Sequence, residues 1–336
     1  MTYSRPNLLW DVTLFSEYPL NQVDPGNYFR TGAVPINNAD WRKYKCIPYC
    51  FDFPNAQLLY SVGVNSTQAS EATFHYLFLR EKTKQLISVP WEVRISEGLE
   101  DVPSPIFIFS PGRCGSTLLG NLVRCMGAIS FSEPDFYTQA VSYSRRCLMS
   151  NIDPSEVVQM LPYLNSDLIV PVLNREAREV VIKLRAEANY LPEIILSVCK
   201  SKPKTIFLIR HFHEWAESTM KFGGNLDQCL YLYTLALDCY RYLQQNSDCL
   251  LIRYEDLRKD NKVLLDKISQ FLSLDQLSDL APIFNRDAQE GTLVQKISNE
   301  GTVSLEIKNQ IRLIWKNKMP LEYLDSDELS YLKFTS

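Results

Sequence analysis

The chain has 336 residues, of which 46% are hydrophobic, and its 35 basic and 39 acidic side chains give a net charge of −4. This composition is typical of a globular protein, and the length allows one large domain or two smaller ones. The slightly acidic balance argues against broad nucleic-acid binding, which needs a strong cationic field, so we expect no nucleic-acid partner. A local cationic cleft for a small anion remains compatible with this balance.

The first residues, MTYSRPNLLWDVTLF, lack a basic start followed by an apolar stretch, and no run in the chain approaches a membrane span of about 18 apolar residues. We therefore expect a cytoplasmic protein without a membrane partner. The nine cysteines are scattered, and their one close pair, Cys46 and Cys50, is followed by no matching Cys or His pair. They predict reduced, mostly buried thiols and no zinc site.

Residues 1–100 are rich in aromatic and turn-forming residues. The stretches 58–64, 73–79 and 86–93 have strand character, which favours a small antiparallel β unit. The polar stretch 97–104 resembles a connector. We therefore divide the chain into an aromatic-rich N-terminal region, 1–100, and a second domain, 101–336.

After residue 104 the chain alternates short apolar strands with helical patterns. The expected strands are 106–109, 180–184, 205–209 and 250–253. The expected helices follow the first strand and cover 137–149, 154–162, 191–199, 213–222, 227–245, 261–272 and 304–316. Such alternation predicts an α/β fold with a parallel sheet covered by helices on both faces. Ligands of such sheets bind beyond the carboxyl ends of the strands.

The stretch 104–123, SPIFIFSPGRCGSTLLGNLV, combines a buried strand, a glycine turn and the start of a helix. The first amides of a helix lack internal partners and carry partial positive charge, and glycines let the backbone wrap closely around a bound group. Arg113 adds a permanent cation with forked donors. The stretch therefore predicts a site for a phosphate or a sulfate ester.

The turn differs from a Walker A loop, because Ser116 and Thr117 follow Gly115 where that motif requires Lys-Ser or Lys-Thr. The pattern Pro-x-Arg-x-Gly-Ser-Thr-Leu-Leu instead resembles the 5′-phosphosulfate loop of the sulfotransferases. The resemblance implies a P-loop-type core and 3′-phosphoadenosine 5′-phosphosulfate as donor. It implies that the donor is held by Gly112, Arg113, Cys114, Gly115, Ser116 and Thr117.

Two later motifs strengthen the resemblance. Arg210 ends an apolar strand and Ser218 follows eight residues later, as do the Arg and Ser that bind the 3′-phosphate in sulfotransferases. The alternative is a strand-capping Arg paired with a nearby glutamate and a solvated Ser. Tyr254 lies in a Tyr-Glu-Asp-Leu stretch, which implies a place near the adenine; the alternative is a partly buried Tyr at a strand end.

The resemblance also implies catalytic residues. In the Arg-Ser-Gly-Thr loop branch, which includes bacterial, carbohydrate and tyrosylprotein sulfotransferases, a Glu about 20 residues after the loop Arg acts as base. Glu133 occupies that position here, with Asp135 and Glu187 as weaker alternatives. Arg113 and Lys183 would stabilise the charge that grows on the bridging oxygen, so that no metal is needed.

Several alternatives remain open. Cys114 lies beside Arg113 near a helix N-terminus, conditions that lower a thiol pKa, or it is a small packing residue. His211 and His213 flank the expected 3′-phosphate segment, and His75 is expected to be structural. A Trp and an Arg-Lys-Gly segment of cytosolic sulfotransferases are absent; Leu118 stands at the Trp position. A nucleotide-binding relative without activity, or a P-loop NTPase or kinase, is therefore the alternative.

The expected partner is an acceptor with a hydroxyl group, such as a sugar, a lipid, a peptide tyrosine or a secondary metabolite. The N-terminal aromatic region is expected to form one wall of its pocket. The sequence favours no particular oligomeric state.

Overall fold

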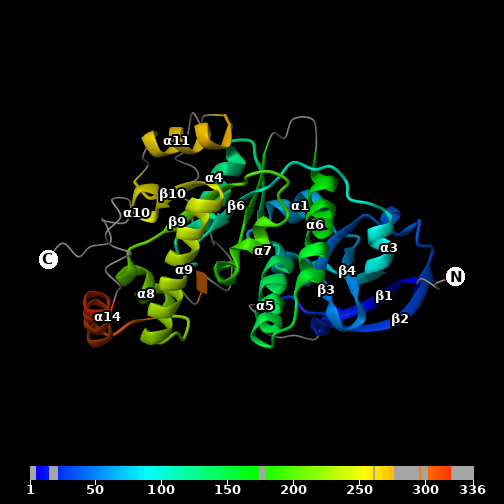
Figure 1. Cartoon of the computed structure of the whole chain (residues 1–336), viewed down its shortest axis with the longest axis horizontal. Coiled ribbons are helices and arrows are strands. Elements are labelled where there is room, and N and C mark those ends of the chain that lie inside the picture. The colour runs from blue at the N-terminus through cyan, green and yellow to red at the C-terminus, as the bar shows by residue number, and fades with distance from the viewer. Residues whose placement is uncertain are drawn as a thin grey trace.

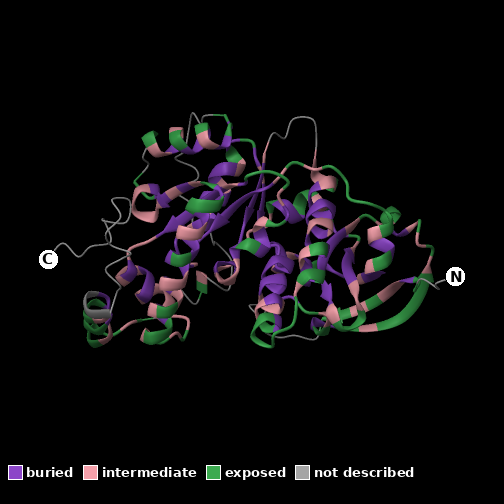
Figure 2. Ribbon diagram, in the orientation of Figure 1, coloured by how far each residue is buried: buried purple, intermediate pink, exposed green. Residues whose placement is uncertain are grey.

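The computed structural model of the chain describes residues 5–14, 22–173, 179–259, 262–275, 295–296 and 302–318. Figure 1 shows two sheets: one is built from the N-terminal strands, and the other lies among the helices that follow. One continuous cluster of buried apolar side chains includes residues from both sheets. The strands that form the inside of each sheet are the most buried segments in Figure 2.

The N-terminal sheet is antiparallel and has five strands in the order β2-β1-β5-β4-β3. Strands β3, β4 and β5 are mostly buried, whereas β2 forms an exposed edge (Figure 2). This sheet confirms the predicted antiparallel unit. Its strands are β1 (Asn7–Leu14), β2 (Tyr28–Ile36), β3 (Cys46–Asp52), β4 (Gln57–Val62) and β5 (Gln85–Pro90).

One strand predicted for this region is wrong. Residues 73–79 contribute to helix α2 (His75–Lys82), which follows helix α1 (Ser66–Glu71). The buried residues of α2 recur three and four positions apart, as in a helix, although its aromatic side chains suggested a strand. The predicted strand 86–93 is shorter than expected, because β5 ends at Pro90 and helix α3 (Trp91–Ser96) begins there. Strands β1, β2 and β3 were not predicted.

The second sheet is entirely parallel and has the order β10-β9-β6-β8-β7. Its strands are β6 (Ile106–Phe109), β7 (Ile129–Ser132), β8 (Val180–Lys183), β9 (Lys204–Ile209) and β10 (Asp248–Arg253). Most of them are short runs of buried residues, as expected for strands covered on both faces. The predicted α/β fold is therefore confirmed, and only β7 was not assigned from the sequence as a strand with bounds.

Helices flank the parallel sheet (Figure 1); α4 packs on β7 and β8, and α9 contacts β10. Helix α6 continues past Pro162, where the sequence predicted its end, because buried contacts of its last two turns hold the helix beyond the proline. Residue 261 of the predicted helix 261–272 lies outside the described residues. The helices are α4 (Ser116–Cys125), α5 (Phe136–Met149), α6 (Ser155–Ile169), α7 (Pro192–Leu196), α8 (Phe212–Met220), α9 (Leu226–Asn246), α10 (Tyr254–Leu257), α11 (Lys262–Leu272) and α14 (Leu305–Lys318).

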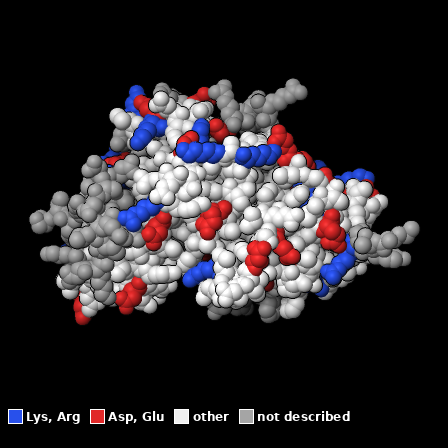
Figure 3. Space-filling model, in the orientation of Figure 1, with Lys and Arg blue, Asp and Glu red and all other residues white. Residues whose placement is uncertain are grey.

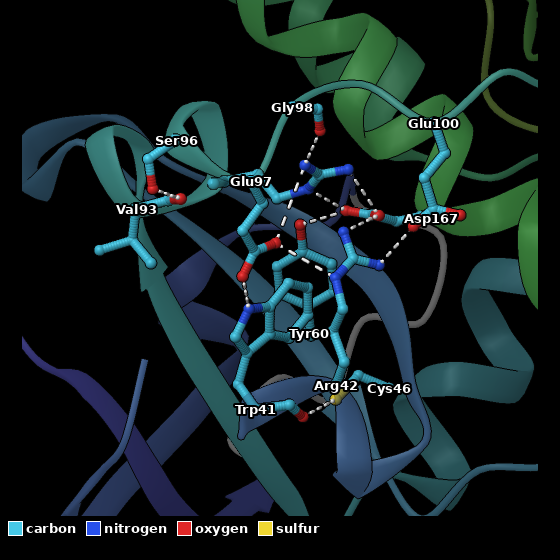
Figure 4. A network of polar contacts seen from close by, with 11 residues as sticks. Trp41, Arg42, Cys46, Tyr60, Val93, Ser96, Glu97, Gly98, Glu100 and Asp167 are labelled. Carbon is cyan, nitrogen blue, oxygen red and sulfur yellow. Dashed lines mark hydrogen bonds and ion pairs between the residues drawn. The ribbon is translucent and has the colours of Figure 1, made fainter. Parts of the chain in front are cut away.

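A buried polar network joins the N-terminal sheet to helix α6 (Figure 4). The carboxylate of Asp167 in α6 accepts two hydrogen bonds of 2.9 Å from the guanidinium of Arg94 and one of 2.7 Å from the hydroxyl of Tyr60. Arg42 adds a contact of 3.2 Å to Asp167 and one of 3.1 Å to Glu97. We call Arg42, Tyr60, Arg94, Glu97 and Asp167 the Asp167 network; it fixes the position of the N-terminal sheet against α6.

On the face of the molecule shown in Figure 3, basic and acidic side chains are interspersed and separated by uncharged surface. Among the helices in the described ranges, none combines the length and the apolar character needed to cross a membrane.

Candidate active site

The loop between β6 and α4 has the backbone that the glycine turn predicted. Gly112, Arg113 and Gly115 all have positive φ angles, of 77°, 56° and 79°. The indole N–H of Trp215 in α8 donates a hydrogen bond of 2.8 Å to the carbonyl oxygen of Gly112 and so supports the loop from one side. Gly115 is the N-cap of α4, which places the unpaired first amides of that helix at the loop.

The ring of Tyr254 leaves no space for a side chain at position 115, so a glycine is required there. A Cβ atom at this position would lie 2.6 Å from ring atoms of Tyr254, which follows β10. Such a distance is a clash, and the positive φ adds a further cost for any other residue. The ring of Tyr254 therefore packs directly on the loop, as its position at the end of a neighbouring strand predicted.

The guanidinium of Arg113 lies 3.9 Å from the ring centre of Phe222, and its Nε donates to the hydroxyl of Ser218 at 3.4 Å. In the part of the chain that the structure describes, it has no carboxylate within ion-pair distance. Burial, together with the nearby charge of Arg210, lowers the pKa of Arg113 to about 10. Glu133 acts on this charge from beyond ion-pair distance. The loop therefore carries a guanidinium that has no ion-pair partner among the described residues, and such positive charge favours the binding of an anion.

Arg210 follows β9 and reaches the same place. Its guanidinium lies 4.6 Å from the ring centre of Tyr254 and 3.5 Å from the carbonyl oxygen of Arg113. It also forms an ion pair of 3.0 Å with Glu214, which is the alternative that the sequence left open. The structure thus brings Arg210, Ser218 and Tyr254 together with the loop, and a ligand of Arg210 would compete with Glu214.

Glu133 and Lys183 meet at the ends of β7 and β8. The carboxylate of Glu133 forms an ion pair with the ammonium of Lys183, whose Nζ also donates to the hydroxyl of Thr117 at 3.3 Å. Lys183 is 4% exposed and Glu133 13%, so both side chains are nearly buried but reach the pocket. Three sequence segments, the loop and the ends of two strands, are therefore joined through one lysine.

A pocket of about 260 Å³ lies over these residues. The predicted residues in its wall are Gly112, Arg113, Gly115, Ser116, Thr117, Glu133, Lys183 and Glu187. Arg210, Ser218 and Tyr254 do not line it but contact the loop or one another, and the side chain of Cys114 is buried. Arg113 belongs both to the pocket wall and to this cationic cluster, so it connects the two.

The two alternative bases have different surroundings. Asp135 has a fully buried side chain that pairs with Arg185 at 3.1 Å, and burial raises its pKa to about 6 despite that partner. It does not line the pocket, whereas Glu187 does, with a long contact of 3.5 Å to Arg185. Glu133 is the carboxylate that lies beside both Lys183 and the loop.

The remaining candidates, Cys114, His75 and His211, do not line the pocket. Burial raises the pKa of the Cys114 thiol, so the expectation of a lowered pKa is wrong and the packing role is correct. His75 is buried, its pKa is lowered to about 4 by burial, and its ring packs against Phe131 in β7. Its expected structural role is in keeping with these contacts. The backbone N–H of His211 donates to Glu255 at the start of α8.

Of the pocket-wall residues that the sequence did not assign to the site, four have aromatic or charged side chains: Phe74, Tyr76, Arg185 and Trp215. Phe74 and Tyr76 flank His75 at the start of α2, in the segment that was assigned to a strand. The ammonium of Lys183 lies 5.0 Å from the ring centre of Phe74, and the guanidinium of Arg185 lies 5.1 Å from that of Tyr76. The alternation of Lys183 and Arg185 after a buried strand was the one available signal.

No group of three His, Cys, Asp or Glu side chains arranged to hold a metal ion occurs among the residues whose placement is described. The positive charge near the pocket comes from Arg113, Lys183, Arg185 and Arg210.

Several solved structures that resemble this chain are sulfotransferases. The mouse sulfotransferase SULT7A1 complexed with PAP is 16% identical with a TM-score of 0.45, and the match covers 71% of this chain and 91% of that chain. The sulfotransferase domain from the curacin biosynthetic pathway is 18% identical with a TM-score of 0.42, covering 69% of this chain and 97% of that chain. The sulfotransferase domain from the Synechococcus PCC 7002 olefin synthase is 17% identical with a TM-score of 0.41, covering 66% and 98%.

No protein-family model matches the sequence. No curated protein matches it either. Likenesses as distant as those to the solved structures assign this chain neither an activity nor a substrate.

Proposed function

We propose that this protein is a sulfotransferase, which moves a sulfuryl group from 3′-phosphoadenosine 5′-phosphosulfate to the hydroxyl group of an acceptor. One observation carries the proposal: Lys183 joins the carboxylate of Glu133 to Thr117 at the start of α4, inside the pocket that the loop lines. A candidate base, a candidate cation for the leaving group and a candidate anion loop are thereby within reach of one bound substrate.

The donor end of the site is the cationic side of the loop. The amides of residues 112–117 and the guanidinium of Arg113 are suited to the 5′-phosphosulfate, since this guanidinium has no ion-pair partner in the described part of the chain. Arg210 and Ser218 are suited to the 3′-phosphate, and the flat face of Tyr254 to the base. For Arg210 to bind the 3′-phosphate, its ion pair with Glu214 must break and the phosphate must take the place of that carboxylate.

The acceptor end is the pocket itself. Phe74 and Tyr76 come from the N-terminal region, 1–100, and form a wall opposite the loop. We assign acceptor contacts to this region and donor binding to the domain 101–336. An acceptor hydroxyl between this wall and the loop would lie beside Glu133.

In the proposed reaction, Glu133 removes the proton of the acceptor hydroxyl as its oxygen attacks the sulfur atom. The bond between that sulfur and the bridging oxygen breaks, and 3′,5′-adenosine bisphosphate leaves. Lys183 has three donors, enough to contact Glu133, Thr117 and the bridging oxygen. Arg113 and Lys183 stabilise the negative charge that grows on that oxygen, as preorganised cations do in phosphoryl transfer.

The first test is a thermal-shift comparison of 3′,5′-adenosine bisphosphate, ATP with Mg²⁺, and buffer. A ligand that binds only the folded state raises the melting temperature, so we expect a rise with the bisphosphate alone. Arg113→Ala and Arg210→Ala should lose most of this rise, since each removes a charged hydrogen-bond donor, a loss of about tenfold or more in affinity. Arg146→Ala, which removes the same charge from the exposed surface of α5, is the matched control.

The second test is turnover of the donor with a panel of hydroxylated acceptors. Sulfated product, absent with Arg113→Ala, would support the proposal. Stabilisation by ATP with Mg²⁺ in place of the bisphosphate would indicate an NTPase or kinase. Binding of the bisphosphate without any donor turnover would indicate a nucleotide-binding protein that has lost catalysis.

A further inference from the structure

Two ion pairs stand one after the other at the ends of β7 and β8. These strands are parallel, with Ser132 opposite Lys183, and the backbone N–H of Glu133 donates to the carbonyl oxygen of Lys183 at 2.7 Å. Glu133 pairs with Lys183, and two residues further along each segment Asp135 pairs with Arg185. The same register therefore produces one pair whose two side chains line the pocket and a second pair of which only Arg185 lines it.

The Asp135–Arg185 pair is built into the interior. The side chain of Asp135 is 0% exposed and that of Arg185 15%. One oxygen of Asp135 accepts both from Arg185 at 3.1 Å and from the backbone N–H of Val23 at 3.0 Å. Arg185 in turn lies 5.1 Å from the ring centre of Tyr76 in the pocket wall. This pair therefore ties together the segments after β7 and β8, the N-terminal region and the aromatic wall.

Glu133 needs such support because its backbone is strained. Its φ angle is 60°, in the left-handed region that residues other than glycine rarely adopt. The next residue is Pro134, which disfavours helical conformations of the residue before it and favours extended ones. A conformation of this kind persists only when the surrounding structure holds it. The contacts with Lys183 of β8 hold Glu133 on one side. On the other side comes the buried Pro134 and then Asp135, the first following side chain that is fixed by hydrogen bonds.

We propose that Asp135 and Arg185 are positioning residues, which hold Glu133 in its left-handed conformation so that its carboxylate faces Lys183 and the pocket. The inference rests on the proposed function, in which Glu133 is the base. Asp135 itself is buried away from the pocket, so it acts through Glu133 and does not touch the acceptor. Because Asp135 precedes α5 directly, it also links this conformation to a long, rigid helix.

The test compares two matched variants. Asp135→Asn removes one charge while keeping the shape of the side chain. Asp52→Asn does the same to a carboxylate of equal burial, 3% exposed, which also pairs with an arginine, Arg30, at 3.1 Å but lies outside the pocket. A general loss of folding stability affects both variants, whereas loss of positioning affects only the first.

We expect Asp135→Asn to lower kcat about 10²-fold, the cost of displacing a catalytic group by about 1 Å, without a change in the affinity for 3′,5′-adenosine bisphosphate. Asp52→Asn should keep its kcat at temperatures below its melting point. Arg185→Met should behave as Asp135→Asn does, and Arg185→Lys, which keeps a charge opposite Asp135, should retain more of kcat than Arg185→Met. Equal kcat values for Asp135→Asn and Asp52→Asn would overturn the inference.

A crystal structure of Asp135→Asn gives a readout that needs no acceptor. We expect Glu133 to leave the positive φ region and to lose its contact with Lys183. If Glu133 keeps both, the positioning role fails, whatever the activity. Failure of the proposed function would appear differently, as a wild-type protein that neither binds the bisphosphate nor transfers sulfate.

Discussion

The molecule holds two clusters of buried charge that differ in one decisive respect. In the Asp167 network both carboxylate oxygens are fully used by Arg94, Arg42 and Tyr60, which lie on regular helices, strands and turns (Figure 4). Both clusters line a pocket, of about 450 Å³ at Asp167 and about 260 Å³ at Glu133. Among the described residues, Glu133 at the edge of the parallel sheet has one ion-pair partner and a strained backbone. Burial of an ion pair and contact with a pocket are thus common to both clusters, and backbone strain distinguishes the candidate site.

The largest expected effect concerns the carboxylate of Glu133. Glu133→Gln should lower turnover about 10²–10⁴-fold, because the amide cannot accept the proton of the acceptor hydroxyl. Binding of 3′,5′-adenosine bisphosphate, measured by thermal shift, should remain. Full turnover in this variant would remove Glu133 from the mechanism.

The next largest effect concerns the Asp167 network. Asp167→Ala should lower the free energy of unfolding by about 3–5 kcal/mol, because it leaves Arg94 buried without its carboxylate. Urea denaturation measures this loss. Below the melting point, kcat should match that of the wild type; a drop as large as that of Glu133→Gln would erase the contrast between the two clusters.

A smaller effect depends on pH. Burial raises the pKa of Asp135 to about 6 from a reference of 3.8, so the folded state binds this proton more tightly than the unfolded state. The contribution of Asp135 to stability should therefore fall as pH rises from about 4 to about 6, by at most about 3 kcal/mol. Arg185, which pairs with Asp135 at 3.1 Å, keeps its charge throughout this window because the neighbouring carboxylates raise its pKa.

Asp135→Asn has no such proton, so its unfolding free energy should vary less over this pH range than that of the wild type. Urea denaturation at several pH values measures both proteins. Identical pH profiles would mean that Asp135 does not titrate in this window.

The smallest effect lies at the rim of the Asp167 network. The side chain of Arg42 is 36% exposed, and it pairs with Glu97, Glu100 and Asp167. Arg42→Gln should cost about 1 kcal/mol of unfolding free energy or less, since water screens an exposed ion pair. A loss as large as that of Asp167→Ala would show that Arg42, and not Arg94, neutralises the buried carboxylate.

The sequence predicted the parts of the fold and site that are local in the chain. The strand, loop and helix around Arg113 lie within 20 residues, and the short apolar runs of β6, β8, β9 and β10 were evident from composition. The gathering of Lys183, Arg210 and Tyr254 at one edge of the sheet followed from the rule that ligands bind beyond the carboxyl ends of parallel strands. Glu133 was singled out by the family resemblance, and its ion pair with Lys183 was not predicted.

The sequence could not predict features that depend on distant partners. Strand β1 pairs with β5 about 80 residues away, and its mixed pattern NLLWDVTL does not alternate cleanly. The segment that contains Phe74 and Tyr76 has the composition of a strand, but it forms the start of helix α2. In this position Phe74 contacts Lys183 and Tyr76 contacts Arg185. The pairing of Asp135 with Arg185 likewise depends on strand register, which no local pattern shows.

The wall formed by Phe74 and Tyr76 has a practical consequence. These two residues lie more than 30 positions before the loop in the chain. They lie at the start of helix α2, whereas the loop lies between β6 and α4. Under the proposed function, substitutions there should alter the acceptor space in front of Glu133 and leave the residues assigned to the donor unchanged. The segment from α1 to α2 is therefore the place to begin a library that tests which alcohols the proposed reaction accepts.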